Sequence, residues 1–185
     1  VYHGPEGLKR IANHVRTMAQ CLSYGFSKME AAVNSLGGPL FDTVIVSLIH
    51  PKASVDQALQ RAADRGYNLR CLYDQQSLRG LVDENDIAIT LDETTTLDDI
   101  NKILTCFEFG RVKAPTVDVN TAINSKHCEN INSFCPDMNR ESSFLTHPVF
   151  NQYHSEHEFL RYTTQLASKD ITLANSMIPL GSCTM

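Results

Sequence analysis

The sequence contains no apolar run long enough to cross a bilayer. Its longest, around residues 44–49, is far shorter than the roughly 20 residues that a spanning helix needs. It also lacks a stripe of basic residues, and 16 Lys and Arg against 21 Asp and Glu give a formal net charge of −5. Phosphate contacts need clustered Lys and Arg. We therefore expect no membrane and no nucleic-acid partner.

No CxxC pair occurs among the six cysteines, which are dispersed along the chain. Cys128 and Cys135, with His127 adjacent, do not have the spacing of a zinc site. We expect reduced intracellular thiols and no metal.

A signal or transit segment is also missing. The chain begins at Val1 and runs at once into a helical pattern, and it stops at Met185 without a polar tail. We expect a piece of a longer chain, in which case the missing presequence says nothing about compartment.

Apolar periodicity and capping signals predict a mixed α/β chain. The run at residues 44–49 is nearly continuous and mostly β-branched, which predicts burial on both of its faces. Residues 75–85 are polar and are expected to form a loop, and residues 169–173 a short extended piece. Helices are expected over about 5–34, from a cap at Ser54 to Gly66, from a cap at Thr96 to about 107 and from a cap at Ser155 to about Ser168, and strands over 41–49, 68–73 and 87–91.

This order of elements indicates three segments. Residues 1–110 are expected to form a small α/β sandwich, a sheet covered by helices. Residues 111–143 are rich in Asn, Ser, Asp and Pro without an apolar period, which predicts a linker or surface excursion. Residues 144–185 form the third segment.

Two groups of residues could carry chemistry. His147, His154 and His157 lie near Glu156 and Glu158, but the spacing is not HExxH, and polar residues at a helix entry explain it as well. In the tail, Ser182 and Cys183 follow Gly181. This is not GxSxG, and no base partner is evident, so a turn that presents N–H and hydroxyl groups to an anion is more plausible than a nucleophile.

None of the seven lysines is a convincing nucleophile. A Schiff-base lysine must be desolvated to lose its proton near neutral pH, whereas Lys9, Lys28 and Lys102 fall on helix surfaces and Lys113 and Lys126 in the polar linker. From the residues alone, the chain is an intracellular α/β piece without a complete active site, which points to a regulatory or interface module.

Three long stretches of the sequence resemble a known family. Leu145-Thr-His-Pro-Val-Phe-Asn-Gln-Tyr-His-Ser-Glu156, Ser176-Met-Ile-Pro-Leu-Gly-Ser-Cys-Thr-Met185 and the opening Val1-Tyr-His-Gly-Pro-Glu-Gly-Leu-Lys-Arg-Ile-Ala12 resemble the glycine decarboxylase family, the P-proteins of the glycine cleavage system. Residues 111–140 are not distinctive.

The resemblance implies a tandem of two fold-type-I pyridoxal-phosphate-like halves, of which only the second binds the cofactor, through a lysine beyond this sequence. Residues 1–110 then correspond to the small C-terminal domain of the first half, 111–143 to the linker and 144–185 to the entry segment of the second half. The resemblance also implies that Ser182, Cys183 and Thr184 lie near the cofactor in the full-length protein.

The resemblance also implies an activity and partners. The family decarboxylates glycine with pyridoxal phosphate and passes the aminomethyl group to the lipoyl arm of the H-protein. It implies a homodimer of the full-length chain, mitochondrial in eukaryotes and cytoplasmic in bacteria, with the 185 residues inert alone. The alternative is a stand-alone α/β regulatory or interaction module without catalysis.

Overall fold

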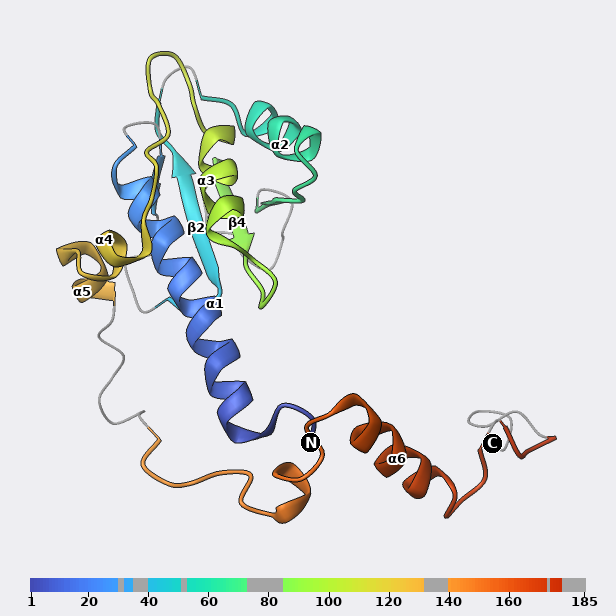
Figure 1. Ribbon diagram of the computed structural model, residues 1–185. Coiled ribbons are helices and arrows are strands. Elements are labelled where there is room, and N and C mark those ends of the chain that lie inside the picture. The colour runs from blue at the N-terminus through green and yellow to red at the C-terminus, as the bar shows by residue number, and fades with distance from the viewer. Residues whose placement is uncertain are drawn as a thin grey trace. The chain divides into compact units, whose positions relative to one another are not determined.

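The computed structural model describes residues 1–29, 32–34, 40–50, 53–72, 85–131, 140–172 and 174–177 of the chain (Figure 1). Its contacts group residues 11–139 into one compact unit and residues 1–10 with 140–185 into another. Among the described residues, no helix combines the length and the apolar character that a membrane crossing requires.

The larger unit is built on an antiparallel sheet. Its central pair is β2 (Thr43–Leu48) and β4 (Asp86–Thr90), in register from Thr43 opposite Thr90 to Ser47 opposite Asp86. Two short strands flank this pair, β1 (Ala32–Asn34) beside β2 and β3 (Arg70–Cys71) beside β4. A sheet combined with helices confirms the predicted α/β class.

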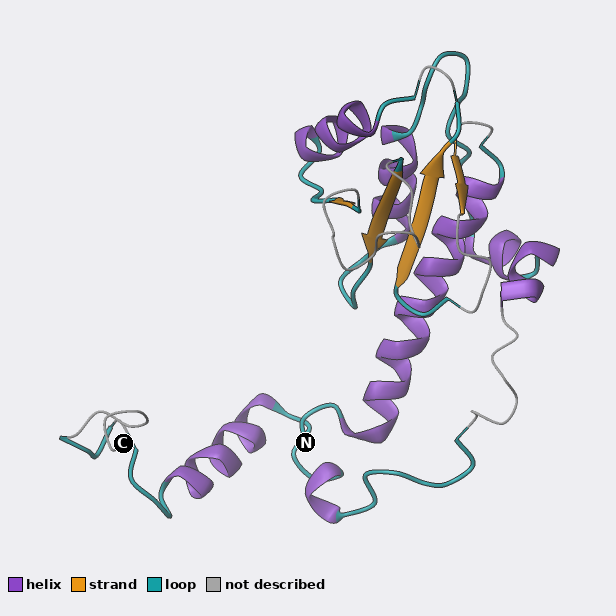
Figure 2. Ribbon diagram, turned by 180° about the vertical axis from the view of Figure 1, so that it is seen from behind, coloured by secondary structure: helices purple, strands orange, loops and turns teal. Residues whose placement is uncertain are grey.

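Helices cover one face of this sheet. The helix α1 (Gly4–Ser27) and the helix α3 (Leu97–Cys106) lie on the same side of the strands, as the two opposite views show (Figures 1 and 2). Between them the rings of Phe26 and Phe107 meet edge to face, with centroids 4.9 Å apart. Both rings are fully buried, and each such side chain contributes roughly 1.5–3 kcal/mol of hydrophobic stabilisation.

The capping signals in the sequence are confirmed. Thr96 and Asp99 form a reciprocal capping box at the start of α3. At α2 (Val55–Asp64) the Ser54 hydroxyl accepts the Gln57 N–H. Gly66 follows this helix with φ +84°, the left-handed conformation that glycine adopts without a steric penalty.

Two predictions for the first 50 residues are wrong. The first helix ends at Ser27 rather than near residue 34, because Ala32–Asn34 pairs with β2 as a strand, and this long-range ladder outweighs local helical preference. The strand β2 is not buried on both faces. Its residues alternate between fully and partly buried, because α1 and α3 cover the same face of the sheet.

Residues 111–131 are more structured than the predicted linker. They contain the short helices α4 (Val119–Ile123) and α5 (Lys126–Ile131). Val117, Ala122 and Cys128 are buried, and the Asn101 side chain accepts the Val117 N–H at 2.8 Å and donates to the Val117 carbonyl. Part of the segment therefore packs into the core, while the proposed domain division itself stays a prediction.

The smaller unit contains a 3-10 turn η3 (Pro148–Phe150) and the helix α6 (Glu156–Ala167). The predicted capping box of Ser155 and Glu158 starts α6. Of the short extended piece predicted at 169–173, the described residues 169–172 form no strand. The loop predicted at 75–85 lies outside the described residues, except for Asn85.

Candidate functional site

The smaller unit has a cavity of about 360 Å³ at the start of α1. Two segments that are far apart in the sequence form it, the opening residues of the chain and the loop between η3 and α6. Both belong to the strings that carry the family resemblance. The lining residues are Tyr2, His3, Gly4, Pro5, Glu6, Gly7, Arg10, Asn151 and His154.

Gly4 allows these two segments to approach each other. Its φ is +62°, and a Cβ added there would lie 2.8 Å from Cε1 of His154 and 2.9 Å from the carbonyl oxygen of Phe150. Any other residue would meet both a steric collision and the strain of the left-handed conformation. The local fold thus requires glycine at this position.

His154 is held in this cavity by the chain's first residues. Its Nδ1 lies 2.8 Å from the Tyr2 carbonyl oxygen, and because a carbonyl only accepts, Nδ1 carries the hydrogen. In the neutral ring, Nε2 is then the acceptor. The cavity therefore combines an imidazole acceptor with the Arg10 guanidinium, a pair that suits a small polar group, while the Asn151 side-chain NH2 already donates to the Leu145 and His147 carbonyls.

The other candidates from the sequence, His147, His157, Glu156 and Glu158, do not line this cavity. The Nδ1 of His147 accepts the Val149 N–H at the start of η3. Hydrogen bonds from Ser155 lower the pKa of Glu158, which caps α6. Within the residues that the structure describes, no three His, Cys, Asp or Glu side chains could hold a metal ion. A role of these residues at the helix entry agrees with this arrangement.

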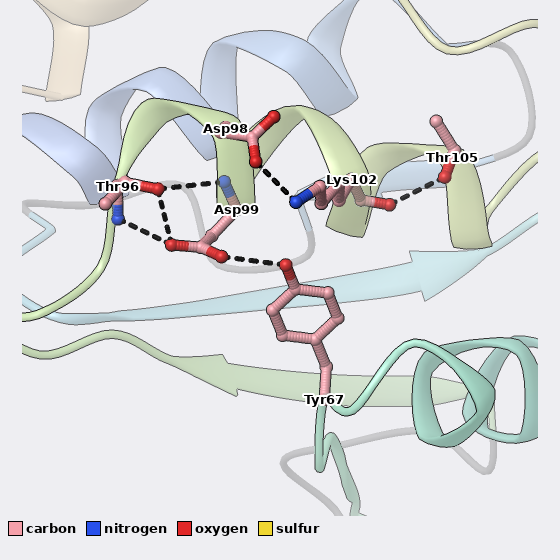
Figure 3. A network of polar contacts seen from close by, with 6 residues as sticks. All are labelled: Tyr67, Thr96, Asp98, Asp99, Lys102 and Thr105. Carbon is pink, nitrogen blue, oxygen red and sulfur yellow. Dashed lines mark hydrogen bonds and ion pairs between the residues drawn. The ribbon is translucent and has the colours of Figure 1, made fainter.

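A second polar cluster joins α2 to α3 (Figure 3). The Tyr67 hydroxyl donates to Oδ1 of Asp99 at 2.8 Å, while Oδ2 of Asp99 accepts the Thr96 N–H and hydroxyl. Burial raises the pKa of Tyr67 to about 12, and the bond to Asp99 acts in the same direction. The bonds from Thr96, then that from Tyr67, lower the pKa of Asp99.

The same helix carries an ion pair between Lys102 and Asp98 at 2.5 Å. An adjoining cavity of about 350 Å³ includes Tyr67, Asp92 and Asp99 in its lining. All the polar contacts of this cluster satisfy helix ends or each other, so we assign it to stability. The spacing of Thr96 and Asp99 predicted a helix cap from the sequence, but no sequence pattern predicted the contact of Tyr67 with Asp99.

A third contact resembles a nucleophile and a base. The Ser23 hydroxyl lies 2.8 Å from Nε2 of His127. Burial, and to a lesser degree the Lys28 ammonium, lower the pKa of this histidine. However, Ser23 is fully buried, so a substrate could not reach it. The contact instead fastens α5 to α1.

The cysteine thiols near this contact are inert. Cys21 and Cys128 are fully buried, and burial raises the pKa of Cys21 to about 11. A thiol with such a pKa is protonated at neutral pH and is a poor nucleophile or metal ligand. The four described cysteines are free. Cys135 lies outside the described residues, so the Cys128 and Cys135 spacing is not visible in the structure.

The described lysines do not fit a covalent pyridoxal phosphate site. All six of them are exposed, and Lys9, Lys102 and Lys113 form ion pairs with carboxylates. A lysine that forms a Schiff base has to be desolvated to lose its proton near pH 7. Lys52 and the predicted site residues Ser182, Cys183 and Thr184 lie outside the described residues, as does Gly181.

Comparison with known proteins gives the family. The sequence profile of the glycine cleavage system P-protein family matches residues 1–107, more than half of the chain. Relatives named glycine dehydrogenase (decarboxylating) align with all of it: the mitochondrial proteins of Pisum sativum at 43% identity and Arabidopsis thaliana at 44%, and the protein of the bacterium Stenotrophomonas maltophilia at 40%. The chain spans 15–16% of their length. It belongs to the glycine cleavage system P-protein family.

Proposed function

We propose that these 185 residues are part of a glycine dehydrogenase (decarboxylating), which releases carbon dioxide from glycine and passes the aminomethyl group to the lipoyl group of the H-protein. One observation carries the proposal: relatives with this name align with the entire chain at 40–44% identity. Because the chain covers only about 16% of those relatives, the activity belongs to the longer protein. The alignment along the whole chain disfavours a stand-alone regulatory or interaction module.

Within that protein, residues 1–110 would form the small C-terminal α/β domain of the first, cofactor-free half. The two-layer arrangement of an antiparallel sheet under α1 and α3 supports this placement. Residues 144–185 would begin the second, fold-type-I half, after a linker over 111–143. The separate grouping of residues 140–185 supports a junction near residue 140, although residues 1–10 join that group.

The longer protein would bind pyridoxal phosphate through a lysine outside these residues. The exposure and ion pairing of the described lysines support this part of the proposal. Ser182, Cys183 and Thr184 would lie near the cofactor, since they form a run of small polar residues beside Gly181. The protein would act as a homodimer, in mitochondria if its source is a eukaryote and in the cytoplasm if it is a bacterium.

The test is an assay of the full-length protein with pyridoxal phosphate, lipoylated H-protein and glycine labelled in its carboxyl group. We expect labelled carbon dioxide in amounts that depend on the H-protein. A folded, cofactor-loaded protein that releases none would overturn the proposed reaction.

A companion measurement tests where the cofactor is attached. Borohydride reduction of the loaded full-length protein should fix the cofactor on a lysine outside residues 1–185. If peptide mass analysis finds the cofactor on one of the seven lysines of this chain, that assignment is refuted, but the proposed reaction is not.

A further inference from the structure

We infer that the apolar face of α6 is an internal packing surface, covered in the whole protein by polypeptide outside these 185 residues. This inference rests on the proposed function, because it requires the longer chain. The helix contains no buried residue. Leu160 is 60% exposed, Leu166 is 46% exposed and, just beyond the helix, Ile171 is 64% exposed.

The exposed apolar residues share one side of the helix. At 100° per residue they occupy an arc of about 160°, with Phe159 and Thr163 nearest its centre, Leu166 beside Phe159, and Glu156 as the one charged residue within it. The opposite side is polar. The arc contains Phe159, Leu160, Tyr162, Thr163, Leu166 and Ala167, and the polar side contains His157, Glu158, Arg161, Thr164 and Gln165.

Contacts within the smaller unit cover only a part of this face. The Tyr2 ring meets Phe159 edge to face with centroids 5.8 Å apart, and the Tyr153 ring stacks on Tyr162 at 4.4 Å. Neither contact buries Leu160 or Leu166. A helix of 12 residues is marginal in water when no tertiary packing supports it. Because α6 is nevertheless regular and capped, we infer that another surface packs against it and stabilises it.

The length of the relatives indicates the occupant of this surface. About five sixths of their sequence lies outside the aligned region. A segment of the same polypeptide competes at an effective concentration that a second molecule does not reach. The occupant would be an apolar surface, because the side chains in the arc offer few hydrogen-bonding groups. We therefore assign the cover to the remainder of the longer chain rather than to a second copy.

Site-specific photocrosslinking in the full-length protein tests the inference. The variant Leu166→p-benzoylphenylalanine places the probe in the arc, and Gln165→p-benzoylphenylalanine places it on the polar side of the same turn. We expect several-fold more crosslinking from position 166 than from position 165, to peptides outside residues 1–185. Equal yields, crosslinks to residues 11–139, or a covalent dimer through position 166 would each overturn the assignment.

A cysteine is a smaller substitution than p-benzoylphenylalanine and is less disruptive to folding, so it provides a second test. In the full-length protein, Leu166→Cys should be alkylated several-fold more slowly than Gln165→Cys, with each rate normalised to the rate in denaturant and each site identified by peptide mass. Equal normalised rates would show that the face stays open. Neither measurement depends on turnover, so an inactive protein with a protected position 166 would refute the proposed reaction alone.

Discussion

The hydroxyl of Tyr67 donates a 2.8 Å hydrogen bond to the carboxylate of Asp99, which also caps α3 through Thr96 (Figure 3). Tyr67 follows α2 and Asp99 lies in the first turn of α3, so one carboxylate connects two helices that are adjacent in the fold.

Removing this hydroxyl should weaken the larger unit. We expect Tyr67→Phe to lower the free energy of unfolding by about 0.5–1.5 kcal/mol, the net value of one such hydrogen bond. Urea denaturation followed by circular dichroism measures it. The control is Tyr24→Phe, which keeps the ring that lies 5.0 Å from the Lys28 ammonium. A larger loss in the control would contradict the role assigned to Tyr67.

Asp99 should make stability depend on acid pH. Its pKa in the folded protein is lowered from the ordinary 3.8, so its contribution is fully present above about pH 4 and disappears as pH falls through the folded value. Asp92, Glu108 and Glu158 are shifted in the same direction. Asp99→Asn should therefore reduce, but not abolish, the loss of stability on acidification.

The measurement is urea denaturation of the wild type and of Asp99→Asn at several pH values from neutral to about pH 2.5. Tyr67→Phe should also flatten the dependence slightly, because it removes one of the bonds that lower the Asp99 pKa. Identical pH dependence in the wild type and Asp99→Asn would rule out this contribution.

Gly4 should tolerate no side chain. Gly4→Ala would place a methyl group against His154 and the Phe150 carbonyl, and we expect it to break the bond between His154 and the Tyr2 carbonyl. Hydrogen exchange should then accelerate in residues 1–7 and 148–156. The matched control is Gly66→Ala, at φ +84° with open space around it, which should cost only the conformational strain of about 1–2 kcal/mol. Unchanged exchange in Gly4→Ala would disprove the steric requirement.

Gly25 brings α1 and α3 together. A Cβ on it would lie 2.5 Å from Cδ1 of Leu104, so Gly25→Ala should destabilise by about 1–3 kcal/mol through overpacking. Adding Leu104→Ala should then cost less than it does alone, because the new methyl fills part of the vacated space. Asn13→Ala on the exposed side of α1 is the control and should stay within about 0.5 kcal/mol. If the free-energy changes of Gly25→Ala and Leu104→Ala simply add in the double variant, the close approach of these two residues is excluded.

The tail can be tested in the full-length enzyme. If Ser182 and Thr184 line the cofactor site, the double variant Ser182→Ala, Thr184→Ala should lower turnover with little change in melting temperature. If they only pack, stability should fall first, by roughly 1–3 kcal/mol for each buried hydrogen bond left unmade. Thr164→Ala, whose exposed hydroxyl bonds within α6, is the control. Full turnover in the folded double variant would reject the site.

Local signals predicted much of the larger unit. The caps at Ser54 and Thr96 and the β-branched run in β2 act over a few residues, so their outcome is readable from sequence, and the same holds for the cap at Ser155 in the smaller unit. β1 was missed because Ala32–Asn34 becomes a strand only by pairing with β2. The segment containing Val117 and Ala122 was missed because two short helices show no apolar period.

The candidate site was less accessible to prediction. His154 was a candidate, but its partners Tyr2 and Gly4 lie about 150 residues away in the sequence, and no spacing rule connects them. The Tyr67 contact with Asp99 likewise depends on how two helices pack. The family resemblance was readable because three long strings, at residues 1–12, 145–156 and 176–185, each resemble the family without reference to the fold.

The outer strands of the sheet have a consequence for behaviour at high concentration. Within the described residues β1 has three residues and β3 has two, so these parts of the flanks offer only a few unpaired backbone groups to another molecule. Long, open edges act as templates for intermolecular β-pairing, and short ones protect against it. Each central strand has a neighbour on both sides, with β1 along Val46–Leu48 of β2 and β3 along Ile87 and Ala88 of β4, and these doubly paired stretches are thus withheld from neighbouring molecules.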